Sequence, residues 1–497
     1  MEKTLVKSSN KTTGLRRRLY RWHRIIGIIT VIPVIFWTLS GLMHPFMANW
    51  FKPTIPNTFL VPKPINKDQM SLSLREVLEK NRIEALKAFQ LVAFEGKTYY
   101  QVKSAKDQLL YLDATTGKLL ENGDKAYAIW LARYFLEDQT SAIKAITLQT
   151  DFDATYKSIN RLLPVWKVDF ARSDGMTIYV ETASSRLGTY NPTSRKAFLW
   201  IFDIFHNWSF LGAITNNTIR VTFMIVLLGI IILSALSGLV IYGMLWKKFR
   251  KPKAGNRIGI LRKYHRQIGL ATALVTFTFA FSGAFHATRK YEPNHLPSYV
   301  YEPITETNTL PKQLPAIQGA PLLNMGLATI AGTPYFRLVQ AKAEGKGSEV
   351  NYLHLQTGEV LPEGDLRYAV YLAEQFNQQI QEKTGEITVI SSQNLVEKAV
   401  LTRFDEEYGF VFKRLPVVKL HYNTPQQTAY YVETSTARLA AKIENIDRAE
   451  GFSFGVFHKF SFMAWAGKDV RDLTTMLSAL GVLVVSLFGL ALFIKIK

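Results

Sequence analysis

Four runs without a charged residue are the feature that most constrains how this chain can fold. They cover residues 25–49, 221–246, 267–288 and 473–494 of a 497-residue chain. A helix rises about 1.5 Å per residue, so each run can cross a hydrocarbon core of about 30 Å. The first run is too long, and too apolar throughout, for a removable signal peptide. The sequence therefore predicts four membrane-spanning helices, with the first serving as an anchor.

The distribution of basic residues predicts the topology. Residues 1–24 contain eight Lys or Arg and one acid, and residues 247–266 contain nine Lys or Arg and no acid. Together with Lys495 and Lys497, these segments hold most of the net charge of +21. Basic residues beside spans mark the cytoplasmic side of a membrane. We therefore expect a bacterial inner-membrane protein with cytoplasmic termini and two large periplasmic segments. Little positive charge remains on those segments, which argues against a nucleic-acid partner and leaves the lipid bilayer.

The chain contains no cysteine. Disulfides, thiolate zinc sites, iron–sulfur clusters and cysteine nucleophiles are therefore excluded, and a metal must be held by His, Met, Tyr or carboxylate. The sequence also contains no GxGxxG, P-loop or HExxH motif. We expect neither a nucleotide-driven pump nor a peptidase, and no binding of NAD or flavin by a recognisable motif.

The second half of the chain repeats the first. At an offset of 242 residues, His23, Ser40-Gly41 and His44 align with His265, Ser282-Gly283 and His286. The polar segments also align: YLDATTGKLLENGDKAYAIWLA (111–132) with YLHLQTGEVLPEGDLRYAVYLA (352–373), YVETASSRLG (179–188) with YVETSTARLA (431–440), and FDIFHNWSFL (202–211) with FGVFHKFSFM (454–463). Each half would be a span, an outer domain and a span, related by a pseudo-two-fold axis along the membrane normal.

The predicted fold is an α-helical four-span membrane bundle with two extracytoplasmic α+β domains. QLLYLDATTGKLL (108–120) predicts two strands around a turn, and GDKAYAIWLARYFL (123–136) predicts a helix capped by Asp124. The predicted parts are a basic tail (1–24), first span (25–49), first outer domain (50–200), interfacial segment and second span (201–246), basic loop (247–266), third span (267–288), second outer domain (289–452), and interfacial segment and fourth span (453–497).

The repeated motifs resemble a known family. YLDATTGKLL and YLHLQTGEVL are similar to PepSY modules. The HRxxG sequences at His23 and His265, and the FH sequences at His206 and His458, resemble the PepSY-associated transmembrane family. That family includes iron-regulated bacterial inner-membrane proteins, and some members are haem-containing reductases of ferric siderophores. The resemblance implies PepSY-like outer domains and a role in iron acquisition.

Six of the nine histidines form repeat-related pairs: His23 with His265, His44 with His286, and His206 with His458. Two imidazoles facing across a helix bundle can supply both axial nitrogens of a b-type haem, which the absence of CxxCH leaves non-covalently bound. The inner pair is His23 and His265. The other histidines of these helices follow 21 residues later, or about 31 Å. We therefore expect two haems or more, one near each membrane face.

The ligands of the outer haem stay open at this stage. His206 and His458 belong to the FH element, whereas the position of His44 and His286 along their spans suits a haem near the outer membrane face better. A third alternative is two outer haems, each bound by one histidine of either kind. Ser40-Gly41 and Ser282-Gly283 would let a macrocycle or another helix approach. Arg24 and Arg266 are candidates for pairing with haem propionates or for anchoring the topology. Aromatic residues that can pack on a porphyrin or form an interfacial belt are Trp22, Tyr264, Phe205, Phe457, Trp208 and Trp465.

The sequence therefore predicts an oxidoreductase that carries electrons outward. The donor would be a membrane quinol or a separate cytoplasmic reductase. The acceptor implied by the resemblance is a periplasmic ferric siderophore or other ferric chelate. Two other functions remain: a PepSY binding or regulatory protein without haem, and a subunit of an iron or siderophore transporter. The lack of acidic residues at mid-membrane counts against ion-coupled transport.

Overall fold

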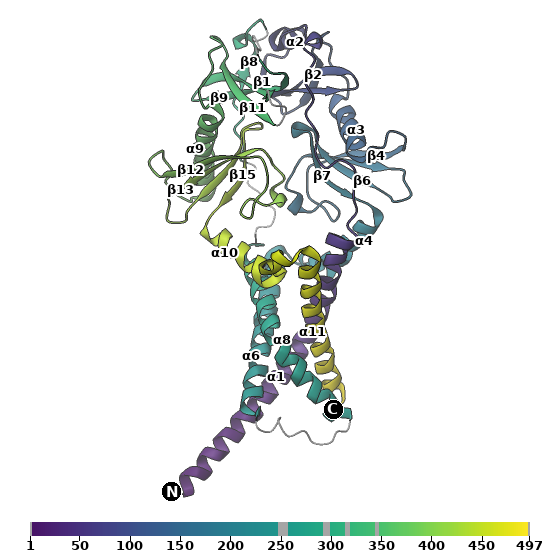
Figure 1. Cartoon of the computed structure of the whole chain (residues 1–497), viewed down its shortest axis with the longest axis vertical. Helices are drawn as coiled ribbons and strands as arrows, with labels where there is room; N and C mark the ends of the chain where they lie inside the picture. The colour runs from purple at the N-terminus through teal and green to yellow at the C-terminus, as the bar shows by residue number, and fades with distance from the viewer. Residues whose placement is uncertain (1, 247–256, 292–298, 314–318, 343–346, 496–497) are drawn as a thin grey trace. The chain divides into compact units, whose positions relative to one another are not determined.

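The computed structural model describes residues 2–246, 257–291, 299–313, 319–342 and 347–495 (Figure 1). Residues 247–256 of the predicted basic loop, and Lys497, lie outside the described residues. The chain forms two compact units. The first comprises Met1–Pro53, Ser194–Asn294 and Asp447–Lys497, and the second comprises Thr54–Thr193 and His295–Ile446.

The first unit contains the four predicted spans, which are confirmed as helices long and apolar enough to cross a membrane. They are α1 (Glu2–Pro45), α6 (Asn217–Met244), α8 (Arg257–Thr288) and α11 (Lys468–Lys495). Helices α1 and α8 each contact both α6 and α11, which closes a four-helix bundle (Figure 1). Shorter elements are α4 (Thr193–Phe205), α5 (Ser209–Ile214), α10 (Asn445–Ser453), the π-helical η1 (Phe46–Trp50) and η7 (Phe454–His458), and the 3₁₀ helix η8 (Ser461–Ala466).

The bundle is apolar both inside and outside. Val34, Ile231 and Val482 belong to its buried core. The outward side chains are apolar as well, and Leu274 is 72% exposed. A helix that is hydrophobic all round suits a span surrounded by lipid. Helix α6 begins where the Asn216 side chain accepts a hydrogen bond from the backbone N–H of Ile219 at 2.8 Å.

The second unit contains three antiparallel sheets. The largest has seven strands: β1 (Ala85–Phe94), β2 (Lys97–Ser104), β3 (Leu109–Asp113), β8 (Thr305–Glu306), β9 (Leu322–Ile330), β10 (Thr333–Ala341) and β11 (Ser348–His354). The two four-stranded sheets have the orders β4-β5-β6-β7 and β12-β13-β14-β15. Their strands are β4 (Ile143–Gln149), β5 (Val165–Phe170), β6 (Thr177–Glu181), β7 (Arg186–Asn191), β12 (Leu395–Leu401), β13 (Val417–Tyr422), β14 (Ala429–Glu433) and β15 (Arg438–Ile443).

Two helices connect the small sheets to the large one through buried side chains. Helix α3 (Gly123–Leu136) packs with Tyr111 of β3 and Ile178 of β6 in one core. Helix α9 (Gly364–Thr384) packs with Tyr352 of β11 and Tyr430 of β14 in a second core. A third core lies beneath α2 (Leu74–Lys80). Short 3₁₀ helices are η2 (Lys67–Gln69), η3 (Ser158–Asn160), η4 (Thr182–Ser184), η5 (Thr307–Thr309) and η6 (Phe410–Phe412).

One sheet contains strands from both predicted outer segments, 50–200 and 289–452. Gln90 of β1 pairs with Gly326 of β9, and the side chain of Asn324 accepts from the N–H of Leu91 at 3.1 Å. A Cβ at Gly326 would lie 3.1 Å from the carbonyl oxygen of Phe89, so glycine permits the close approach. The two segments therefore form one body.

Two local predictions differ from the structure. The strand expected after the turn at Thr116-Gly117 is reduced to a single bridge between Leu119 and Leu112. Asp124 lies in the first turn of α3 but is not its cap, because Asn122 holds the N-cap position. The Asp124 carboxylate instead accepts from the Tyr111 hydroxyl at 2.8 Å and the Trp166 indole at 2.6 Å.

Candidate functional site

The inner histidines lie opposite one another in the first unit. His23 of α1 and His265 of α8 have ring centroids 6.5 Å apart, with ring planes inclined by 58°. An imidazole nitrogen binds a metal at about 2.0–2.1 Å, and the ring centroid lies about 1.2 Å behind that nitrogen, given ring bonds of about 1.3–1.4 Å. Two imidazoles on opposite sides of one metal would thus have centroids about 6.4 Å apart. The observed spacing fits two axial ligands of one iron.

Hydrogen bonds fix which nitrogen of each inner imidazole carries the proton. The Ser237 hydroxyl donates to the carbonyl of Ser234 at 2.8 Å, so its oxygen accepts from His23 Nδ1–H, also at 2.8 Å. His265 Nδ1 lies 3.0 Å from the carbonyl oxygen of Val485, which can only accept. Both imidazoles therefore carry the proton on Nδ1. With the proton on Nδ1, the Nε2 of each imidazole is the nitrogen that keeps a lone pair for a metal.

Glycines of the closing helices make room for the two inner rings. A Cβ at Gly238 of α6 would lie 3.3 Å from Cε1 of His23. A Cβ at Gly489 of α11 would lie 3.3 Å from Cε1 of His265. Each imidazole therefore rests directly against a helix backbone, which limits how far the ring can tilt.

The FH histidines are held by serines of the opening spans. The Ser40 hydroxyl donates to the carbonyl of Phe36 at 2.7 Å and lies 3.1 Å from Nδ1 of His206. Ser282 donates to the carbonyl of Thr278 and lies 3.2 Å from Nδ1 of His458. Each serine hydroxyl donates its hydrogen to a backbone carbonyl, so its oxygen accepts from the Nδ1–H of the histidine. The Nε2 of each histidine is then the nitrogen with the lone pair. The sequence identified these serines only as small residues.

A phenylalanine lies between the two outer histidines of each half. Phe202 stacks on His206 at 4.3 Å and lies 5.8 Å from His44. Phe454 stacks on His458 at 4.8 Å and on His286 at 4.4 Å. This pair was not among the predicted candidates, which were the phenylalanines directly before the two histidines. The signal was present, because FDIFH and FGVFH place a second aromatic ring four residues before the histidine, on the same helical face.

The two halves differ at the outer ends of α1 and α8. His286 Nδ1 lies 2.6 Å from the Glu450 carboxylate. His44 instead packs beside Phe198, with ring centroids 6.5 Å apart. The four outer histidines lie close enough for charge on one to act on the others. The four outer imidazoles therefore lie near one another, but His286 has a carboxylate partner and His44 has an aromatic neighbour.

The arginine and aromatic residues that were predicted to lie beside the histidines have different neighbours from one another. The Arg24 guanidinium lies over the Phe493 ring at 5.1 Å, and Arg266 acts electrostatically on His265. Phe205 packs on Phe36 at 4.9 Å. The remaining aromatic candidates include Trp208, stacked on Trp37; Phe457, beside Phe281; Tyr264, beside Phe488; and the exposed Trp22 and Trp465.

Within the described ranges, no group of three or more His, Cys, Asp or Glu side chains can hold a metal ion. The spacing of His23 and His265 is compatible with a site that two imidazoles share. His354 and His421 lie in the second unit, on β11 and β13, and His295 lies outside the described residues. Comparison with family models found no match, and no curated protein matched the chain.

Proposed function

We propose that the chain is a bacterial inner-membrane haem protein of the PepSY-associated transmembrane family. It would carry electrons from the cytoplasmic side to a periplasmic ferric acceptor, a ferric siderophore, in iron acquisition. The observation that carries the proposal is the 6.5 Å spacing of His23 and His265, both with Nδ1 protonated. Haem b supplies one-electron redox chemistry when bound.

Residues of this chain would hold and orient the group. His23 and His265 present Nε2, while Ser237 and the carbonyl of Val485 hold the far side of each ring. Such partners fix the ring orientation and raise the basicity of the ligand. At the other end, His206 and His458 present Nε2 from the serines that anchor them. Ser40 follows His23 by 17 residues, which is about 25 Å along α1, so the inner and outer sites lie at different depths in the membrane.

Matched local structures support an internal duplication. The β5–β6 and β13–β14 pairs share one register, because Trp166 pairs with Val180 as Val418 pairs with Val432, at an offset of 252 residues. The carboxylate of Asp365 accepts from the Tyr352 hydroxyl at 2.9 Å, as Asp124 does from Tyr111. Both features lie in segments that the resemblance assigns to PepSY modules. A duplicated chain would place each histidine pair about a pseudo-two-fold axis.

Charge and the shared sheet support the proposed topology. The basic segments beside the spans favour cytoplasmic termini. The pairing of β1 with β9 is consistent with both outer segments lying on one side. This arrangement leaves the second unit free to present a surface to a ferric chelate in the periplasm. Reduction would release iron from such a chelate, because Fe(II) binds hard oxygen ligands less tightly than Fe(III).

The test is a dithionite-reduced minus oxidised visible spectrum of the full-length protein, with haem counted against protein. We expect a b-type spectrum and about two haems per chain. His23→Ala and His265→Ala should each remove the same fraction of the haem. His354→Asn, in the second unit, is the matched control and should retain all of it. A flat spectrum from protein made with sufficient haem would refute the proposal, as would equal haem content in all four proteins.

A further inference from the structure

The basic end of the first unit carries arginines whose charge the protein does not neutralise. Arg16, Arg17, Arg18 and Arg21 of α1 are exposed, and none of them forms an ion pair with the described residues. The described parts of the four long helices at this end contain no Asp or Glu; they are residues 14–24, 239–246, 257–266 and 489–495. An anion that neutralises these arginines therefore comes from outside this part of the chain.

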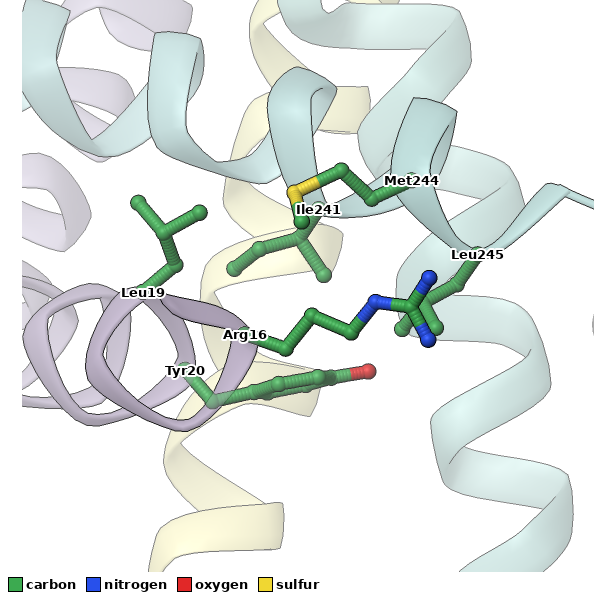
Figure 2. Close-up of a pocket in the computed structure, with 6 residues that line it drawn as sticks. All are labelled: Arg16, Leu19, Tyr20, Ile241, Met244 and Leu245. Carbon is green, nitrogen blue, oxygen red and sulfur yellow. The ribbon is translucent and has the colours of Figure 1, made fainter. Parts of the chain in front are cut away.

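The seam between α1 and α6 offers no cavity for such an anion (Figure 2). Its lining residues are Arg16, Leu19, Tyr20, Ile241, Met244 and Leu245. Figure 2 shows the Arg16 side chain running across the seam toward Leu245, with the Tyr20 ring on one side of it and Ile241 and Met244 on the other. Side chains therefore fill the seam, and a ligand of the neighbouring arginines has to bind on the outer surface of α1.

Two of the arginines lie on the outward side of α1. Arg18, Trp22 and Ile29 follow the spacing i, i+4 and i+11, which places them along one side of the helix. Trp22 is 59% exposed and Ile29 is 49% exposed, so this side faces away from the bundle. Arg21 follows Arg18 by three residues, and side chains with that spacing are neighbours, with Cβ atoms about 5–6 Å apart. Arg18 and Arg21 can therefore contact one phosphate group together.

The outward side of α1 is also the side that faces lipid if α1 crosses a membrane. The charge-free run of this candidate span begins at Ile25. At about 1.5 Å per residue, Arg21 lies about 6 Å and Arg18 about 10 Å before that residue. Head groups extend about 5–8 Å beyond the hydrocarbon core, and a long arginine side chain can place its charge in that layer. Trp22 is a residue type that is enriched at the same depth. The two arginines are thus continuous with the apolar surface of the span, at the level of the head groups.

The repeat-related positions on α8 have a different composition. At the offset of 242 residues, Ile260 takes the place of Arg18, and Lys263 takes the place of Arg21. The Nζ of Lys263 lies over the Tyr264 ring at 5.8 Å. The outward pair of arginines is therefore specific to α1, and α8 has a single lysine with an aromatic neighbour in its place.

We propose that Arg18 and Arg21 bind the phosphate of an anionic phospholipid, such as phosphatidylglycerol. Guanidinium groups bind phosphate through parallel N–H donors, and the acyl chains lie along Ile25 and Ile29. Phosphatidylethanolamine fits less well, because its ammonium group meets no carboxylate among the described residues at this end. The alternative partner is an acidic protein, but the continuity of the arginines with the lipid-facing side of α1 favours the lipid. The inference uses α1 only as a span and does not depend on the proposed haem.

The test is native mass spectrometry of the full-length protein, titrated in detergent with phosphatidylglycerol and, separately, with phosphatidylethanolamine. We expect phosphatidylglycerol to bind more tightly. Arg18→Gln and Arg21→Gln should each weaken its binding about fivefold, which corresponds to about 1 kcal/mol for each charge. Arg403→Gln is the matched control and should leave the binding unchanged, because Arg403 is an exposed arginine of the second unit that forms no ion pair with the described residues.

A variant that keeps the charge separates the loss of a cation from a change in the fold. Arg18→Lys combined with Arg21→Lys should retain most of the binding of phosphatidylglycerol. Equal affinity of the wild type for the two lipids overturns the site. Equal affinity of Arg18→Gln, Arg21→Gln and Arg403→Gln for phosphatidylglycerol also overturns it, and leaves an acidic protein as the partner of these arginines. The haem content of the same samples tests the proposed function separately, and a flat visible spectrum with normal lipid selectivity supports this inference alone.

Discussion

Replacing Ser40 with alanine tests whether His206 is an outer ligand. Ser40 is 2% exposed, and its oxygen is the acceptor for His206 Nδ1–H at 3.1 Å. Ser40→Ala removes that acceptor without adding bulk, while the backbone of α1 keeps its own hydrogen bonds. The imidazole then loses its hydroxyl acceptor and keeps only the backbone of Trp37 as a hydrogen-bond partner among the described residues, so the ring is less firmly oriented.

The size of the effect follows from that lost acceptor. A typical intramolecular hydrogen bond contributes about 0.5–1.5 kcal/mol. Loss of a partner that orients a metal ligand lowers metal affinity about 10- to 100-fold. The two ranges overlap near tenfold, so Ser40→Ala should weaken retention of the outer haem by about tenfold while leaving the inner haem in place.

The assay is a titration of haem-depleted protein with haemin, followed by the visible spectrum, and it needs a control on the same helix. Thr38→Val serves this purpose, because the Thr38 hydroxyl donates to the carbonyl of Val34 at 2.7 Å and makes no hydrogen bond to a histidine. Equal outer-haem affinity in Ser40→Ala and Thr38→Val would refute the assignment of His206. Loss in Ser282→Ala would extend the assignment to His458.

Three further outcomes follow from packing and charge. Gly238→Ala places a Cβ 3.3 Å from the His23 ring and should weaken inner-haem retention about tenfold in the same titration. Burial alone would raise the pKa of Glu433, but the Arg186 and Arg414 cations outweigh burial and hold it at about 2, below the ordinary 4.5. The ionised carboxylate therefore stabilises the second unit above pH 4.5, and this contribution is lost as the pH falls from 4.5 toward 2, measured as a falling thermal midpoint. Arg414→Met should destabilise that unit by about 3–5 kcal/mol in denaturant titrations, because it leaves a buried carboxylate short of a partner.

A matched control variant separates each of these effects from a general loss of stability. Gly229→Ala is the control on α6, because a Cβ there meets nothing within 4 Å. Lys398→Met is the control for Arg414→Met, because Lys398 forms an exposed pair with Glu363, and such pairs contribute about 0–1 kcal/mol. Equal destabilisation by these two variants would contradict the role given to burial, and a pH-independent midpoint would contradict the role given to Glu433.

Much of the first unit is predictable from the sequence because its signals are local. A long charge-free run is enough to predict a span, and all four predicted runs fall in helices. The repeat also paired His23 with His265, and the rings lie opposite one another. Ser237 was not predictable, since its bond to His23 joins residues 214 positions apart.

In the second unit, local sequence patterns predict the helices but not the contacts between distant residues. The helix at Gly123–Leu136 was predicted from its apolar period and is confirmed. Asp124 was predicted as a cap because carboxylates are common in that position. Its role was set instead by Trp166, 42 residues away, whose indole bonds the carboxylate. Likewise, the sequence of β1 does not predict that this strand pairs with one as distant in the chain as β9.

The pairing of β1 with β9 has a consequence for synthesis of the protein. Gln90 leaves the ribosome more than two hundred residues before Gly326, and α6 and α8 must both be inserted between them. Contacts so distant in sequence form late and slowly. Until the second outer segment arrives, one edge of β1 has no neighbouring strand, and open strand edges invite pairing with other chains. The first outer segment therefore keeps an unpaired strand edge until β9 has been made, and a chaperone that covers strand edges would protect it during that time.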